Sequence, residues 1–157
     1  PGTHIFISGE DSETTISGFR FRGATESAVV IADGTGSWRT DGAREQTIGD
    51  SSFADNQNYW HNGGAIQAGV ATSTYIANSY FEGNTAARMG GAVSGESSKV
   101  SVLDSTFSSN SAPVGGALSS NQVDSILILA GNSFDDKPVT FEAGQYVLRA
   151  GDVGDSM

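Results

Sequence analysis

The chain has 157 residues and a formal net charge of −10, with 18 acidic and 8 basic residues. This charge repels phosphate backbones and anionic lipid surfaces, so we expect no nucleic-acid partner. The absence of cysteine excludes disulfides, thiolate zinc sites and a cysteine nucleophile. The longest apolar run, residues 126–130, is far shorter than the ~20 residues that span a bilayer, so we expect no membrane insertion.

One pattern recurs five times along the chain: an aliphatic residue stands five positions before a phenylalanine. The phenylalanines of this pattern are Phe21, Phe53, Phe81, Phe107 and Phe134. The last four follow one another at a nearly constant spacing, whereas the interval from Phe21 to Phe53 is longer. A nearly constant period indicates structural repeats that stack on one another.

Two further elements follow the phenylalanines. Three positions after three of them stands an asparagine, namely Asn56, Asn84 and Asn110. A Gly-Gly-Ala sequence followed by Ile, Val or Leu comes next, at residues 63–66, 90–93 and 115–118. Asparagine amides at equivalent turn positions can pair along a stack, and paired glycines permit tight turns. We therefore interpret both elements as structural.

The repeat predicts an all-β fold, a right-handed single-stranded parallel β-helix of about six coils. Short β-rich segments alternate with Gly, Asn, Asp and Ser, and helical periodicity is almost absent. The period is too short for the four strands of a propeller blade, and the leucine-rich consensus is missing. Equivalent residues of successive coils should lie ~4.8 Å apart, with the phenylalanines in one internal ladder.

We expect one domain over residues 1–157. Repeat coils should occupy residues 16–137, because natural repeat proteins cover their sheet edges with atypical terminal units. Residues 1–15 are then an N-terminal cap or first coil, and residues 138–157 are a C-terminal cap. Since the sequence begins with Pro1, we expect a processed product or an excised segment of a longer protein.

The paired FxxN and GGA(I/V/L) elements resemble the repeat of chlamydial polymorphic outer-membrane proteins and, more widely, the pectate-lyase-like β-helix class, over about residues 45–135. In the polymorphic proteins these tetrapeptides recur through an autotransported adhesin passenger. The resemblance implies a secreted or bacterial cell-surface location and contact with a host or matrix surface, and it implies no reaction. The chain departs from that family in having no cysteine and only three complete motif pairs.

The stretches between the asparagine and the double glycine should lie along one edge of the stack. They are residues 57–62, 85–89 and 111–114. Aromatic rings beside a cation and amides suit a sugar ring. The predicted ligand-binding residues of this edge are Tyr59, Trp60, His61 and Arg88. The alternative is that the aromatic rings fold over the edge of a coil as local packing.

The insertion at residues 34–45, which lengthens the first interval, contains a further candidate, Trp38. An enlarged loop is a common place for function, and the alternative is that Trp38 plugs the edge of the first coil. No catalytic residue is predicted. No metal site is predicted either, since the chain has no EF-hand loop and no calcium-binding nonapeptide. Calcium is the one candidate cofactor, at Asp135 and Asp136.

Three functions remain open from the sequence. The first is a non-enzymatic scaffold for adhesion, display or glycan binding, whose partner is a glycan or a host or matrix surface. The second is a structural subunit that self-associates through the ends of the helix. The third is a polysaccharide lyase or glycoside hydrolase on an acidic polysaccharide, and it depends on fold analogy. A lyase would use Arg88 or Lys99 as base, and a hydrolase would use Asp135 with Asp136, or Asp55 with Glu82, as the carboxylate pair.

Overall fold

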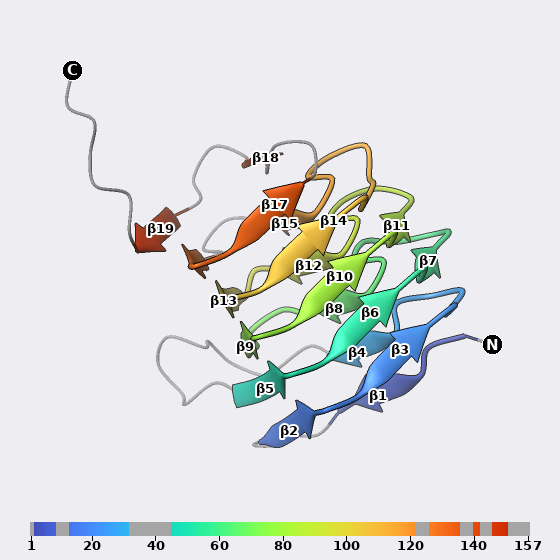
Figure 1. Ribbon diagram of the computed structural model, residues 1–157, viewed down its shortest axis with the longest axis horizontal. Coiled ribbons are helices and arrows are strands. Elements are labelled where there is room, and N and C mark those ends of the chain that lie inside the picture. Colours follow the sequence, from blue (N-terminus) through green and yellow to red (C-terminus); the bar gives the residue numbers. More distant parts are fainter. Residues whose placement is uncertain are drawn as a thin grey trace.

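A parallel β-helix is the architecture of the computed structural model (Figure 1). The structure describes residues 2–8, 13–31, 45–121, 126–135, 140–141 and 146–150. All regular secondary structure in these ranges is β-strand, and every strand pairing is parallel. The predicted fold class is therefore confirmed. The described part of the chain contains no helix long and apolar enough to cross a membrane.

Three sheets form the sides of the β-helix, and a fourth, short sheet lies at one corner. Sheet A contains β1 (Ile5–Ile7), β4 (Val29–Ile31), β8 (Ile66–Ala68), β12 (Val93–Glu96), β15 (Leu118–Asn121) and β18 (Thr140–Phe141). Sheet B contains β2 (Thr14–Ser17), β5 (Glu45–Gly49), β9 (Ser73–Ala77), β13 (Lys99–Leu103), β16 (Ile126–Ala130) and β19 (Tyr146–Ala150). Sheet C contains β3 (Arg20–Arg22), β6 (Ser52–Ala54), β10 (Tyr80–Glu82), β14 (Thr106–Ser108) and β17 (Ser133–Asp135). The short sheet D pairs β7 (Gln57–Asn58) with β11 (Thr85–Ala86).

The number of coils is slightly smaller than the about six that the sequence predicts. Four turns of the helix separate Phe21 from Phe134 along sheet C. Strands from both predicted caps continue the regular sheets beyond these turns. At the N-terminal end β1 pairs with β4, and at the C-terminal end β18 and β19 pair with β15 and β16.

The five repeat phenylalanines stack in one ladder inside sheet C. Neighbouring ring centroids are 4.7–4.9 Å apart, and the planes of neighbouring rings differ by only 2–13°. Phe53, Phe81 and Phe107 are fully buried, whereas Phe134 at the end of the ladder is 37% exposed. At the opposite end, the rings of His4 and Phe19 lie 6.2 and 6.0 Å from the ring of Phe21.

Left-handed residues make the corners on both sides of each phenylalanine. Three positions before the phenylalanine, φ is positive at Gly18, Asp50, Asn78, Asp104 and Gly131. Two positions after it, φ is positive at Gly23, Asp55, Gly83 and Ser109. Glycine, asparagine and aspartate tolerate this conformation better than other residues, which explains why they occupy all of these positions except Ser109.

The repeat asparagines form a buried hydrogen-bonded ladder beside the phenylalanines. Asn84 Oδ1 accepts bonds from the backbone N–H and the side-chain amide of Asn56, at 3.2 and 2.9 Å. The side-chain amide of Asn84 donates to Asn110 Oδ1 and to the Phe53 carbonyl, both at 2.9 Å. Each asparagine thus ties two successive turns together and satisfies a backbone carbonyl that lies inside the corner.

Substitution of Asn84 by alanine should strongly destabilise the chain. It leaves the two donors of Asn56 and the Phe53 carbonyl short of a partner in a buried corner. Each such loss costs ~1–3 kcal/mol, so we expect the free energy of unfolding in urea to fall by ~3–5 kcal/mol. Alanine at the adjacent, exposed Thr85 is the control and should change it by less than ~0.5 kcal/mol. Equal effects of the two substitutions would contradict a stabilising asparagine ladder.

Candidate functional site

The loops between sheet C and sheet A stack on one another, and we call residues 57–62, 85–89 and 111–114 the flank. Sheet D aligns the first two loops in register, with Gln57 opposite Thr85. Isolated bridges from Thr85 to Ser111 and from Met89 to Val114 align the second loop with the third. The flank is therefore a continuous surface built from three successive turns.

A buried asparagine fixes the first loop of the flank. Asn58 Oδ1 accepts hydrogen bonds from the backbone N–H groups of Trp60 and His61, at 3.2 and 2.9 Å. The side-chain amide of Asn58 donates to Ser27 Oγ and to the Asn62 carbonyl, both at 3.0 Å. Because Asn58 is only 4% exposed, these bonds hold the backbone of residues 59–61 against the body of the β-helix.

The aromatic side chains of this loop project into solvent. Trp60 is 71% exposed and Tyr59 is 57% exposed, and His61 is exposed as well. The phenolic hydroxyl of Tyr59 donates to Gln57 Oε1. Both residues therefore keep more than half of their surface open to solvent. Together they place two exposed aromatic rings on a backbone that is held in place.

Arg88 lies on the neighbouring turn of the flank. Two backbone hydrogen bonds of 2.9 Å join its loop to the first loop, one on each side of Arg88. They run from Ala87 N to the Asn58 carbonyl and from Gly63 N to the Met89 carbonyl. The register thus brings Arg88 alongside the loop of Tyr59 and Trp60. Arg88 is exposed and forms no ion pair with any residue that the structure describes. Its guanidinium group is available to donate hydrogen bonds to a ligand.

Of the other predicted ligand and metal residues, Asp135 alone lies in the described part of the chain. Trp38 and Asp136 lie outside the described residues. Asp135 is exposed at the end of β17, and the described residues contain no group of three His, Cys, Asp or Glu side chains that would hold a metal ion. His4 stacks on Phe21 at the N-terminal end of the ladder, remote in the repeat from His61.

Of the residues considered for an enzymatic reaction, the carboxylates of Asp55 and Glu82 lie on neighbouring turns, and the two candidate bases lie apart from each other. The Asp55 carboxylate, however, is paired with the Arg22 guanidinium at 2.9 Å, and both side chains of this ion pair are well exposed. The arrangement does not resemble the desolvated carboxylates of a glycosidase. Lys99 is in β13 of sheet B, whereas Arg88 is in the flank.

Sequence reasoning missed the residues that support the flank. Asn58 was not distinguished from its neighbours, although an asparagine side chain in a turn typically bonds to backbone N–H groups two or three positions later. Asn62, at the other end of the loop, donates to Glu96 Oε1 at 2.9 Å. This bond ties the loop to the end of β12 in sheet A, on the next turn of the helix.

The fold and the flank define a β-helical repeat protein with an exposed aromatic loop. Residues 78–96 match the family model described as the Chlamydia polymorphic membrane protein repeat. The match covers one FxxN element at 81–84 and one Gly-Gly-Ala-Val element at 90–93. No curated protein and no solved structure matches the chain.

Proposed function

We propose that this chain is a β-helical part of a bacterial cell-surface protein and that it binds glycans through the flank without altering them. The observation that carries the proposal is the exposure of Trp60 and Tyr59 on a loop that Asn58 holds. The match of one repeat to a family of polymorphic membrane proteins supports a place at the cell surface.

The composition of the flank favours a sugar over other ligands. An aromatic face packs against the apolar C–H face of a sugar ring, and the Arg88 guanidinium and nearby amides can bond to its hydroxyls. Because the loop backbone is already fixed, binding orders few additional groups. The net charge of −10 repels anionic polymers, so neutral glycans are favoured over acidic ones.

The substitution Trp60→Ala tests this proposal on a glycan array. We expect the wild-type chain to bind a subset of neutral glycans and the variant to bind them at least about tenfold more weakly, since it loses the largest exposed ring. Tyr75→Ala is the matched control, because Tyr75 is an exposed aromatic residue of sheet B, away from the flank. A clean array for the wild-type chain would reject the glycan function, and equal binding by Trp60→Ala would reject the flank as the binding site.

A second candidate function is end-to-end assembly, which the N-terminal edge favours. At this end β1, β2 and β3 are the outermost described strands of sheets A, B and C, and each pairs on one side only, with β4, β5 and β6. An edge strand presents unpaired backbone groups that can pair with another chain. Light scattering over a concentration series tests this: growth of the mass with concentration supports assembly, and a constant monomer mass rejects it.

A further inference from the structure

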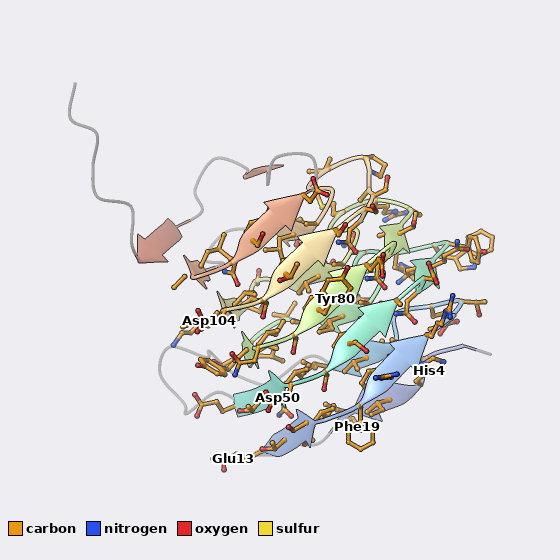
Figure 2. All side chains as sticks on the ribbon, in the orientation of Figure 1. His4, Glu13, Phe19, Asp50, Tyr80 and Asp104 are labelled. Atoms are coloured by element: carbon orange, nitrogen blue, oxygen red, sulfur yellow. The ribbon has the colours of Figure 1, made fainter. Side chains whose placement is uncertain are left out.

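The outer surface of sheet C contains an open hollow of about 510 Å³ that is separate from the flank. Three successive turns line it, and Figure 2 places Phe19, Asp50 and Tyr80 on this side of the stack. We call it the Ser52 hollow. Its lining residues are Gly18, Phe19, Arg20, Asp50, Ser51, Ser52, Asn78 and Tyr80.

The register of sheet C explains why the surface is hollow here. Arg20, Ser52 and Tyr80 are register partners on three successive strands, β3, β6 and β10. They point outward, because they alternate with the inward phenylalanines of the ladder. A serine therefore stands between two long side chains, and its small size leaves the space between Arg20 and Tyr80 open.

Of the two arginines of β3, Arg22 forms an ion pair with another described residue and Arg20 does not. Arg22 is held by Asp55 on the next turn, at 2.9 Å. Arg20 has Ser52 as its register partner instead, and within the described residues it forms no ion pair. Its guanidinium therefore lines the hollow with its donors available.

The remaining lining groups offer acceptors and an aromatic surface. The Asp50 carboxylate accepts a hydrogen bond from Ser17 Oγ at 3.2 Å and has further acceptor capacity. Asn78 offers an amide with both a donor and an acceptor, and Tyr80 is 40% exposed, so part of its ring is open to solvent. Asp50 and Asn78 stand at the left-handed corners before Phe53 and Phe81, which fixes their backbone.

We infer that the Ser52 hollow binds the ring of a neutral sugar. The aromatic face of Tyr80 suits the apolar side of such a ring, and Arg20, Asp50 and Asn78 suit its hydroxyls as donors and acceptors. One cation and one carboxylate give the hollow no net charge, while the whole chain carries −10, so an acidic sugar is disfavoured. The volume is within the ~300–1,000 Å³ of small-molecule sites.

The experiment is an NMR titration of the isotope-labelled chain with cellobiose, lactose and maltose, and with digalacturonate as the acidic comparison. We expect at least one neutral disaccharide to shift the backbone amides of residues 18–20, 50–52 and 78–80. Tyr80→Ser, which introduces a residue type already present at Ser52, should weaken this binding about tenfold. Ser52→Tyr should abolish the binding, because the new ring fills the hollow. Tyr80 is the register partner of Ser52 on the next turn, so sheet C already accommodates a tyrosine at this position.

Tyr75→Ser on sheet B is the matched control and should leave the titration unchanged. The inference is overturned if no neutral disaccharide shifts these amides, if digalacturonate is preferred, or if Tyr80→Ser and Ser52→Tyr bind as the wild type does. Shifts confined to residues 57–62 and 85–89 would overturn the Ser52 hollow while supporting the flank. Trp60→Ala, conversely, should leave binding at the hollow intact even where it removes binding at the flank.

Discussion

Alanine at Gly91 should prevent the chain from folding into a stable β-helix. A Cβ atom there would fall on the carbonyl oxygen of Gly116 and would lie 2.5 Å from the backbone nitrogen of Ser111. Both are backbone atoms of the next turn, so they can move only if two turns separate. We expect the free energy of unfolding to fall by more than ~4 kcal/mol, a large part of the ~5–15 kcal/mol of a typical domain.

Urea unfolding followed by circular dichroism measures this effect, and Gly23→Ala is its control. Gly23 has a positive φ, of 68°, but no atom lies within 4 Å of its Cβ position. Alanine at Gly23 should therefore cost only the left-handed backbone strain, ~1–2 kcal/mol. If Gly91→Ala were no more destabilising than Gly23→Ala, this result would contradict the close approach of successive turns at Gly91.

Alanine at Phe81 should remove the centre of the phenylalanine ladder. The ring is fully buried and stacks on Phe53 at 4.8 Å and on Phe107 at 4.7 Å. Truncation of a buried phenylalanine costs ~3–5 kcal/mol, and two lost stacking contacts add to the cavity. We expect a loss at the upper end of this range, measured by the same urea unfolding.

Phe134→Ala provides the comparison at the end of the same ladder. Phe134 is 37% exposed and stacks on Phe107 at 4.9 Å. Less buried apolar surface is lost there and no enclosed cavity forms, so we expect about half the destabilisation of Phe81→Ala. Equal losses for the two substitutions would contradict a ladder whose strength comes from burial in its middle turns.

The spacing of the phenylalanines, together with the short β-rich segments and turn residues between them, predicted the fold. A large apolar residue that returns at a nearly constant interval can stay buried if successive turns are stacked in register. The observed pairing of Phe53 with Phe81 and of Phe81 with Phe107 is that register. The FxxN asparagines follow at a constant offset, so their alignment along the stack was predictable as well.

The corners were less predictable, because different residues perform the same task there. The left-handed position before the phenylalanine is aspartate at Asp50 and Asp104, asparagine at Asn78, and glycine in two other turns. A ladder of polar side chains one residue later was also missed. Its members are Ser51, Ser79, Ser105 and Asn132, each accepting a backbone N–H from the preceding turn.

The two candidate sites depend on relations that a single sequence does not show. Trp60 is exposed on a loop whose backbone N–H groups bond to Asn58 Oδ1, and the sequence does not distinguish Asn58 as the residue that makes these bonds. The Ser52 hollow depends on Arg20 and Tyr80 flanking Ser52 across turns. Each of the three stands directly before a phenylalanine of the repeat, so the sequence aligns them, but it does not show that the space beside Ser52 is open.

The most direct test of the account is to incubate the chain with immobilised neutral and acidic glycans and then to analyse the recovered glycans by mass spectrometry. We predict that neutral glycans retain the wild-type chain, that Trp60→Ala weakens this retention, and that all glycans are recovered with unchanged mass. Absence of retention, or recovery of shortened or unsaturated products, would contradict a β-helical surface that binds glycans without altering them.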